Sequence, residues 1–480
     1  MDETGITVKK AENISEWYQQ LMIKAGLADY SAVSGCLVFR PRSYAVWEVI
    51  QSETDKRFKK IGIQNAYFPL LIPESLLTKE SKHIEGFAPE VAWVTQSGSS
   101  DMAERLAIRP TSETIMYDSY SKWIRSWRDL PLRLNQWNNV VRWEFKNPVP
   151  FLRTREFLWN EGHTAFATKE EAMAEGPQII EAYEDVMHNY LALPTIRGRK
   201  TEFEKFAGAE YTISLECFLP SGKSIQGPDF HHDGQIFAKA FDIKFKNKQD
   251  EMEYAYQNTF AISTRVIGIM LMMHGDDKGV VMPPKVAQEQ VRIIPLFFKG
   301  KEELVTQKAQ ELKSQLDSVA RIEIDMDTEH NVGFRFGQCE LEGIPLRVEL
   351  GPRDIENNSC IVVRRDTGEK ITLKLEELAQ KIPELLDAIH TNLYQKADEF
   401  MQSNMVTVDN MDDFKKAIEE KKLVKALFCN DPNENWEDKI KEQTGADPRN
   451  IPENQEPVEN GTCVISGKPA QYYCYFAKSY

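Results

Sequence analysis

The fold is decided by two stretches, LRLNQWNNVVRWEF (residues 132–145) and LWNEGHTAFAT (residues 158–168), joined through the loop NPVPFLRTR. Both have the aromatic and β-branched content of strands, and the loop between them contains two prolines. They therefore predict an antiparallel hairpin with a long basic tip. Arg142 and Glu144 would lie in its first strand, and Arg153 on the tip.

On either side of this hairpin, helices and strands alternate irregularly. Apolar periodicity and strand-like composition predict helices over 14–25, 43–60, 113–127, 169–190 and 263–273, and strands over 62–77, 210–220 and 224–226. Neither of the two common glycine-rich phosphate-binding motifs occurs. This order predicts an α+β domain with an antiparallel sheet rather than a parallel dinucleotide-binding sheet.

A second pattern starts after Pro283 and Pro284. It predicts strands over 291–298, 321–326, 345–350 and 359–375, and helices over 301–318 and 376–403. A polar stretch and the aromatic ending QYYCYFAKSY follow. We therefore expect three domains, an α+β domain over 1–286, a compact α/β domain over 287–400 and a small C-terminal domain over 401–480.

Composition sets the broad class. The 480 residues include 41% hydrophobic and 28% charged residues, which is typical of a globular protein. No apolar run approaches the ~20 residues of a membrane helix, the first residues do not resemble a secretory signal, and seven scattered cysteines form no disulfide framework. These features predict a cytoplasmic protein with no membrane partner.

Charge is unevenly distributed along the chain. The net charge of -15 argues mildly against bulk binding of nucleic acid, since neutralising phosphates requires Lys and Arg. Residues 119–155, however, hold eight basic and two acidic residues, a local charge of +6. Residues 401–460 hold eight basic and 14 acidic residues, a local charge of -6. The basic stretch indicates a polyanion site such as a nucleotide, although solvated basic faces of a hairpin remain an alternative.

Three groups of residues could carry chemistry. Arg142 with Arg153 suits the binding of a triphosphate, because an arginine presents a fixed planar fork of donors; an Arg142–Glu144 pair can also be purely structural. Thr111 and Glu113 in RPTSET could hold a ligand amine or simply cap a helix. Arg265 opens an apolar helix, where a cation is unfavourable unless an anion joins it or the side chain reaches solvent.

In this order, the residues resemble the three signature motifs of class II aminoacyl-tRNA synthetases, and more closely prolyl-tRNA synthetases of the archaeal and eukaryotic type. GIQNAYFPLLIP resembles motif 1 with Pro69, RWE with the loop to Arg153 resembles motif 2, and NTFAISTRVIG with HGDDKGVVMPP resembles motif 3 with Arg265. RPTSET, FLWNEGHTAF, KFAGA and YFAKSY also match family signatures, so the resemblance spans essentially the whole chain.

The resemblance implies an antiparallel catalytic domain, an α/β anticodon-binding domain and a homodimer. It implies that ATP, with Mg²⁺, activates L-proline as prolyl-adenylate, and that the prolyl group passes to tRNA(Pro). An alternative is a paralogue that activates another amino or imino acid. A non-catalytic tRNA-binding regulator is a further alternative, but such a protein would usually lose the motif 2 and motif 3 arginines.

The resemblance also implies roles for individual residues. Arg142, Glu144 and Arg265 would be catalytic, and with Arg153 and Gln226 would bind ATP. The amino-acid site would comprise Thr111, Glu113, Arg142, Trp159, Glu161, His163 and Phe206, and the anticodon site Glu340, Arg347, Arg353 and Arg364. No metal ligands are expected among these residues.

The sequence departs from the family pattern at three places. The usual GTSHH is PDFHH (228–232), and the usual WG is Phe260–Ala261, so we expect added bulk and charge beside the amino-acid pocket. Cys429, Glu434, Cys463 and Ser466 stand where archaeal-type relatives often hold zinc, and they predict no zinc. Ala165 to Gln226 leaves no room for the editing domain of bacterial-type relatives, so we expect no editing in cis.

Overall fold

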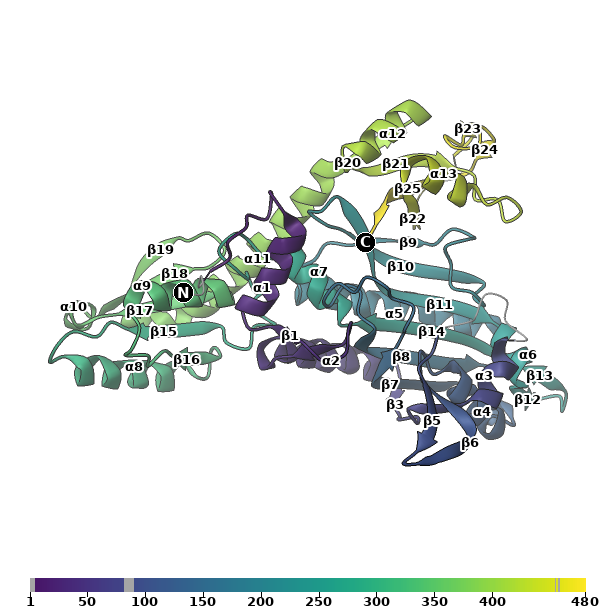
Figure 1. Ribbon diagram of the computed structural model, residues 1–480, viewed down its shortest axis with the longest axis horizontal. Coiled ribbons are helices and arrows are strands. Elements are labelled where there is room, and N and C mark those ends of the chain that lie inside the picture. The colour runs from purple at the N-terminus through teal and green to yellow at the C-terminus, as the bar shows by residue number, and fades with distance from the viewer. Residues whose placement is uncertain (1–4, 82–89, 454, 456–457) are drawn as a thin grey trace.

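The protein has three arms (Figure 1) in a computed structural model that describes residues 5–81, 90–453, 455 and 458–480. One arm contains a five-stranded sheet, the second contains most of an eleven-stranded sheet, and the third contains the C-terminal strands. Within the described ranges, none of the helices combines the length and apolar character needed to cross a membrane.

The eleven-stranded sheet is the framework of the molecule. In spatial order its strands are Met405–Val408 (β20), Leu423–Phe428 (β21), Tyr472–Ser479 (β25), Asp447–Pro452 (β22), Ile196–Arg199 (β9), Tyr211–Phe218 (β10), Lys223–Gly234 (β11), Tyr256–Ser263 (β14), Glu156–Phe166 (β8), Leu132–Val141 (β7) and Gln64–Asn65 (β3). From β9 to β7 every neighbouring pair is antiparallel. The predicted α+β class and the β7–β8 hairpin are confirmed.

One face of this sheet is covered by helix α5 (Lys169–Asn189), which packs across β8, β14, β11 and β10. The Thr168 side chain caps the helix by accepting a hydrogen bond from the Glu171 N–H at 3.2 Å. On the sheet, the Asn258 side chain donates to the Ala172 carbonyl at 2.8 Å. Side chains alternate along a strand, so neighbours of Asn258 on β14 point to the opposite face, which α5 leaves open.

The remaining elements of this arm surround the sheet. They are α1 (Ile14–Lys24), β1 (Ala28–Tyr30), β2 (Leu37–Phe39), α2 (Pro41–Lys60), β4 (Leu71–Pro73), α3 (Glu74–Ser81), β5 (Trp93–Ser97), β6 (Ser100–Ile108), α4 (Glu113–Trp123), η1 (Trp127–Asp129), α6 (Ile236–Phe241), β12 (Lys244–Lys246), β13 (Met252–Tyr254) and α7 (Arg265–His274). The largest buried apolar cluster joins α1, α2, α5 and α7 to the central strands.

The second sheet is mixed. Its strands are β16 (Ile322–Ile324), β15 (Val291–Pro295), β17 (Leu346–Leu350), β18 (Ser359–Arg364) and β19 (Lys370–Lys374), with β15 parallel to both β16 and β17 and the rest antiparallel. Its helices are α8 (Glu302–Leu316), α9 (Val332–Glu342), α10 (Pro352–Glu356), η2 (Leu375–Glu377) and α11 (Leu378–Asn404). These strands and the helices α8 and α11 share a separate buried apolar cluster.

The C-terminal segment extends the central sheet. Besides β20, β21, β22 and β25, it contains α12 (Met411–Glu419), α13 (Trp436–Thr444), β23 (Gly461–Thr462) and β24 (Pro469–Ala470). β22 pairs with β9, which places Ile451 opposite Arg199. The C-terminal strands thus join one continuous sheet with the strands that precede them by more than 200 residues.

Three buried charged side chains lie at this junction. Glu216 on β10 accepts a hydrogen bond from Lys200 Nζ at 2.6 Å and from Arg449 Nη2 at 2.8 Å, and Lys200 also donates to the Arg449 carbonyl at 2.8 Å. Burial opposes ionisation of Glu216, but the charges of Arg449 and Lys200 lower its pKa to about 2. The glutamate therefore stays anionic and links the C-terminal segment to the sheet.

Two predicted elements differ from the structure. Residues 62–77 were expected to form an extended strand broken by Pro69 and Pro73; they contain the short strands β3 and β4, but α3 starts at Glu74, where strand was expected. Between these strands, the Phe68 N–H bonds to the Gln136 side chain at 2.9 Å rather than to a neighbouring strand. Strand β7 ends at Val141, so Arg142 follows the strand and Glu144 lies in a turn, whereas both were expected within it.

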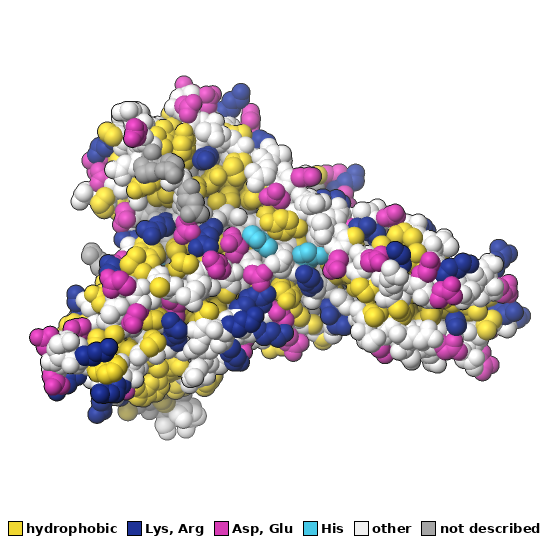
Figure 2. All heavy atoms as spheres, turned by 180° about the vertical axis from the view of Figure 1, so that it is seen from behind, with side chains coloured by type: hydrophobic (Ala, Val, Ile, Leu, Met, Phe, Trp, Pro, Cys, Tyr) yellow, Lys and Arg dark blue, Asp and Glu magenta, His cyan; other side chains and the backbone are white. Residues whose placement is uncertain are grey.

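The surface shows why the net charge is a poor guide to local charge. Side chains of both signs are spread over the rear face, where Lys and Arg side chains gather near the middle (Figure 2). The net excess of acidic residues is thus compatible with locally basic surface.

Candidate active site

A cavity of about 260 Å³ opens on the face of the central sheet that α5 leaves free. It is lined by Thr111, Glu113, Arg142, Trp159, Glu161, Gly162, His163, Glu204, Phe206, Thr212, Gln226, Asp229, His231, Thr259, Phe260 and Ala261. The structure therefore brings together every residue that the sequence assigned to the amino-acid site, and adds Gln226 from the predicted ATP site.

The strand register explains this convergence. In one row across the sheet, Asp229 on β11 lies opposite Ala261 on β14, and Ala261 lies opposite Glu161 on β8. Two residues along each strand, His231, Thr259 and His163 form a second row. Because side chains alternate with a period of two, both rows face the cavity.

Thr111 and Glu113 form one end of the cavity. Both are buried, and the Thr111 hydroxyl donates to the Glu113 carboxylate. Ser112 occupies the N-cap position of α4, but its side chain makes no capping bond and instead donates to Glu161. The helix-cap alternative therefore does not describe what these side chains do.

Glu161 is held rigidly as an anion. Its carboxylate accepts hydrogen bonds from the Ser112 N–H at 2.9 Å, from Gln136 Nε2 at 2.8 Å and from Asn138 Nδ2 at 2.6 Å. Although burial opposes ionisation, hydrogen bonds from His163 and other neighbours lower the pKa of Glu161 below its usual value. The negative charge is thus present at neutral pH.

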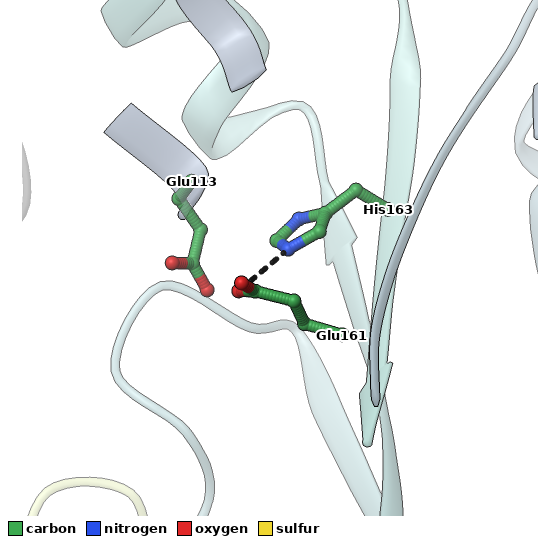
Figure 3. A group of neighbouring side chains, drawn as sticks. All are labelled: Glu113, Glu161 and His163. Atoms are coloured by element: carbon green, nitrogen blue, oxygen red, sulfur yellow. Dashed lines mark hydrogen bonds and ion pairs between the residues drawn. The ribbon is translucent and has the colours of Figure 1, made fainter. Parts of the chain in front are cut away.

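Glu113, Glu161 and His163 point toward one another (Figure 3). One potential ligand atom from each lies within 4.8 Å of the others, and Nε2 of His163 is 3.4 Å from Oε2 of Glu161. Glu161 has its oxygens committed to hydrogen bonds, whereas Glu113 receives the Thr111 hydroxyl. Two carboxylates and a hydroxyl suit a small organic ammonium, which needs acceptors at short range. That the site binds no metal stays a prediction.

Aromatic rings form the walls of the cavity. The Phe206 and His231 rings stack with their centres 4.7 Å apart. Burial lowers the pKa of His231, so its ring is neutral near pH 7. The guanidinium carbon of Arg142 is 5.2 Å from the ring centre of Trp159, another residue of the lining. Aromatic rings and one guanidinium thus line this cavity.

His231 was not among the predicted site residues. Strand alternation could have indicated it, because Asp229 and His231 are two residues apart and would share a face if the strand continued through them. Gln226 also lines the cavity although it is three residues from Asp229, because the β10–β11 register shifts between Ser214 and Glu216. Alternation alone therefore could not predict which residues of β11 share the cavity.

Of the predicted ATP-binding residues, Arg142 and Gln226 line the cavity, whereas Glu144, Arg153 and Arg265 do not. Arg265 donates from Nε to the Leu152 carbonyl and from Nη1 to the Gln226 carbonyl, each at 3.2 Å. Burial, followed by the positive charge of Arg142, lowers the pKa of Arg265. Its guanidinium is thus buried beside like charge, an arrangement that an anionic ligand would relieve.

Glu144 and Arg153 lie outside the cavity. Both are exposed, and Arg153 lies over the Phe145 ring at 5.0 Å from its centre. Arg142 itself is anchored by a bond from Nε to the Pro110 carbonyl at 3.1 Å. The hairpin tip therefore projects Arg153 beyond the cavity, and the structure leaves the roles of Glu144 and Arg153 as predictions.

Phe230 does not crowd the pocket, contrary to the expectation from PDFHH. It is fully buried on the α5 face, where a Cβ added at Gly176 would be 2.9 Å from its ring. Phe260 lies opposite it, and a Cβ at Gly162 would be 1.9 Å from the Phe260 ring. Two glycines thus provide the space that the rings require. Of the five residues that differ from the family pattern in these two motifs, Asp229 and Ala261 lie in the row of side chains that faces the cavity.

We expect Gly176→Ala to lower the free energy of unfolding by about 1–3 kcal/mol, because the added methyl overpacks against the Phe230 ring. Urea unfolding would measure the change. Gly337→Ala on α9 is the matched control, since a Cβ there meets nothing within 4 Å. That change should raise stability by up to about 1 kcal/mol through helix propensity. Equal effects of the two substitutions would contradict the packing account.

Three of the four predicted anticodon residues line a second cavity, of about 140 Å³. These are Glu340, Arg347 and Arg364, whereas Arg353 on α10 does not line it. Arg347 donates to Glu349 at 2.8 Å, and Arg364 donates to Asp366 at 2.8 Å. Both arginines are thus fixed by carboxylates beside the cavity.

The positions that would correspond to a zinc site contain a lysine salt bridge. Lys468 Nζ is 2.5 Å from Glu434 and 3.4 Å from Asp431, and the Cys463 sulfur accepts a bond from the Ser466 N–H at 3.4 Å. In the sequence HGDDKG, Asp276 accepts two hydrogen bonds from Arg365, at 2.6 and 2.8 Å. The absence of zinc remains a prediction.

Residues 93–274 match the tRNA synthetase class II core domain (G, H, P, S and T), residues 290–385 match the anticodon-binding domain, and residues 411–480 match the prolyl-tRNA synthetase C-terminal domain. Fold and cavity together define a class II aminoacyl-tRNA synthetase. The chain is 47% identical to the cytoplasmic proline–tRNA ligase of Arabidopsis thaliana, over 99% of this chain and 91% of that one, and 47% identical to the proline–tRNA ligase of Lachnospira eligens, over 98% and 97%. It belongs to the prolyl-tRNA synthetases.

A solved structure agrees with this assignment. The crystal structure of prolyl-tRNA synthetase from Cryptosporidium parvum, complexed with halofuginone and AMPPNP, matches with a TM-score of 0.95 and 41% identity, over 99% of this chain and 100% of that one. The activity of the chain is accordingly the ATP-dependent attachment of proline to tRNA through prolyl-adenylate. The predicted recognition and function are confirmed, and the paralogue alternative is not favoured.

Proposed function

We propose that the 260 Å³ cavity is where proline and MgATP react, with each end of the cavity serving one substrate. The observation that carries this proposal is that the cavity lining brings the carboxylates of Glu113 and Glu161 together with the guanidinium of Arg142, whose charge also acts on the buried Arg265. Proline is an ammonium, a small apolar ring and a carboxylate. The cavity offers a complementary group for each of the three.

At the amino-acid end, Glu113 and Thr111 bind the secondary ammonium. Glu161 fixes the geometry of this end through its bonds to Ser112 and His163. The prolyl ring lies between Trp159 and the stacked Phe206 and His231 rings. Apolar aromatic walls suit this small apolar ring.

At the nucleotide end, Arg142 binds the carboxylate of proline and the α-phosphate of ATP, and Arg265 and Gln226 lie beside the triphosphate. Arg153 closes over the distal phosphates from the hairpin tip, and Glu144 contacts the adenine. AMPPNP in the related Cryptosporidium structure supports the use of ATP. The main contribution of a protein to phosphoryl chemistry is to position the reacting groups and to stabilise the phosphate charge, here with arginines.

The reaction then needs positioning more than proton transfer. A carboxylate oxygen of proline attacks the α-phosphorus, the bond to the bridging oxygen breaks, and pyrophosphate leaves. A hydroxyl of the 3′-terminal ribose of tRNA next attacks the carbonyl carbon of prolyl-adenylate, and AMP leaves. Arg142 holds both reacting groups in the first step, and this can supply a large part of the rate.

Beyond the cavity, the three predicted domains carry separate tasks. Residues 1–286 catalyse, residues 287–400 bind the anticodon with Glu340, Arg347, Arg364 and Arg353, and residues 401–480 support the catalytic sheet without zinc. A homodimer through the segment 62–77 is supported by its exposed Tyr67 and Leu71. A cytoplasmic location is supported by the name of the Arabidopsis relative.

Glu113→Gln tests the amino-acid end. The substitution keeps the shape of the side chain but removes the counter-charge, so we expect the KM for proline to rise about 30- to 100-fold, corresponding to about 2–3 kcal/mol for a charged hydrogen bond. The KM for ATP should change by less than about threefold. Pyrophosphate exchange at varied substrate concentrations would measure both. Asp118→Asn, on the same helix but at the surface beside Lys122, is the matched control.

A further inference from the structure

The segment that joins β9 to β10, residues 200–210, separates two cavities. Its Glu204 and Phe206 line the active-site cavity. Its Glu202 and Lys205 line a second cavity of about 630 Å³, at the boundary with the C-terminal segment. Because there is a hollow on each side of this irregular segment, the position of Phe206 depends on the contacts that hold the segment in place.

Segment 200–210 is held both by the catalytic sheet and by the C-terminal segment. On the sheet side, the Phe206 N–H donates a hydrogen bond to the Thr212 hydroxyl of β10 at 3.1 Å. From the other side, the side-chain oxygen of Asn430 accepts a hydrogen bond from the Glu202 N–H at 2.9 Å. Asn430 also lines the second cavity, shortly after β21 ends. A residue of the C-terminal segment thus supports the cavity wall from behind.

A buried carboxylate of the C-terminal segment faces the same wall. Glu437 lies in the first turn of α13, where its N–H donates to the capping Asn435 side chain at 3.1 Å. The Glu437 side chain is buried, and within the described ranges neither of its oxygens has a hydrogen-bond partner of good geometry. The groups that face it are, on segment 200–210, Lys200, Thr201, Phe203 and Glu204, and on β25, Cys474.

The surroundings of Glu437 favour its neutral form. Burial raises its pKa to about 7, and the charge of Glu204 adds to this rise, whereas the Thr201 hydroxyl and the charge of Lys200 oppose it. The carboxyl group is therefore mostly protonated at pH 6 and mostly ionised at pH 8. Once ionised, Glu437 repels Glu204, which lines the active-site cavity. The contact between α13 and the wall is thus weaker at the higher pH.

We propose that Asn430 and Glu437 are positioning residues for the proline pocket. From the C-terminal segment they hold segment 200–210, so that Phe206 keeps its place in the wall of the pocket. Neither residue lines the active-site cavity, so both act on the binding of proline through segment 200–210. This inference rests on the proposed function, which places the prolyl ring against Phe206.

Asn430→Ala removes the acceptor of the Glu202 N–H, so we expect the KM for proline to rise about three- to tenfold, the effect of one hydrogen bond. The kcat and the KM for ATP should change by less than about twofold, because the groups that bind ATP are untouched. Pyrophosphate exchange by the full-length chain would measure all three. Asn430→Asp keeps an acceptor oxygen and should restore most of the affinity for proline. Asn433→Ala, in the exposed turn nearby, should match the wild type.

Glu437→Gln gives a second readout, because the amide has the shape of the carboxyl group but stays neutral at every pH. Between pH 6 and pH 8 the KM for proline should rise about two- to fivefold more in the wild type than in this variant, since Glu437 ionises in that range. The ratio of the two KM values removes the contribution of other titrating groups. A ratio that stays constant over this range would contradict the role of Glu437.

Phe206→Ala separates failure of this inference from failure of the proposed function. Removal of the ring should raise the KM for proline, because the ring is a wall of the proposed pocket. A raised KM in Phe206→Ala with an unchanged KM in Asn430→Ala would overturn the inference and leave the pocket assigned. An equal rise of the KM for proline and for ATP in Asn430→Ala would also overturn it, as a general loss of structure. An unchanged KM in Phe206→Ala would instead refute the proposed pocket.

Discussion

Arg142→Ala is expected to lower kcat/KM for proline-dependent pyrophosphate exchange by about 10³-fold or more, equivalent to about 4 kcal/mol of transition-state stabilisation. Arg142 follows the end of β7 and is fixed by its bond to the Pro110 carbonyl and by the Trp159 ring. It is the one cavity residue to which we assign both the proline carboxylate and the α-phosphate. Its loss should therefore affect adenylation whichever amino acid is offered.

Two further variants sharpen this expectation. Arg142→Lys keeps the charge but loses the planar fork, so it should recover only a small part of the activity. Arg125→Ala removes an exposed arginine from the same basic stretch and should leave exchange unchanged. Retention of exchange by Arg142→Ala within about tenfold of the wild type would refute the assignment of the site.

Glu216→Gln is expected to lower the free energy of unfolding by about 3–5 kcal/mol, because it leaves Lys200 and Arg449 buried without their shared counter-charge. The loss would appear in urea unfolding of the full-length chain. Glu74→Gln is the matched control, since Glu74 pairs with Arg105 at the surface, where solvent screens the interaction. Equal effects of the two substitutions would contradict the account of the junction.

The low pKa of Glu216 predicts that the free energy of unfolding depends on pH. Its pKa of about 2 in the folded chain lies below the usual 4.5, so its contribution to stability is complete above about pH 4.5 and is lost as the pH falls toward 2. Stability attributable to Glu216 should therefore be constant between pH 7 and pH 5. Comparing the wild type with Glu216→Gln over pH 3–7 would show whether their difference shrinks only at the acidic end.

The sequence predicted the residues of the cavity better than their arrangement. The family resemblance assigned one pocket to Thr111, Glu113, Trp159, Glu161, His163 and Phe206, and the structure places them around one cavity; that they bind proline stays a proposal. Local patterns predicted the hairpin β7–β8 and the helices α2 and α5 because their apolar periodicity is strong. The C-terminal strands could not be assigned to the central sheet, since pairing between β22 and β9 is set by residues far apart in sequence.

Side-chain direction was the main feature that sequence could not supply. Phe230 was expected beside the pocket, yet it points to α5, where Gly176 gives it space. The register shift in β10–β11 decides that Gln226 and Asp229 share a face, and no local pattern predicts such a shift. The net charge of -15 was likewise misleading about the tRNA partner, because binding depends on local charge.

Pyrophosphate exchange with a panel of single amino acids tests the central claim most directly. The full-length chain would be incubated with MgATP, labelled pyrophosphate and one amino acid at a time, including proline, alanine and cysteine. The arrangement of Glu113, Trp159, Phe206 and His231 predicts that proline supports the fastest exchange. Strong exchange with another amino acid, and none with proline, would contradict the assignment of this cavity to proline.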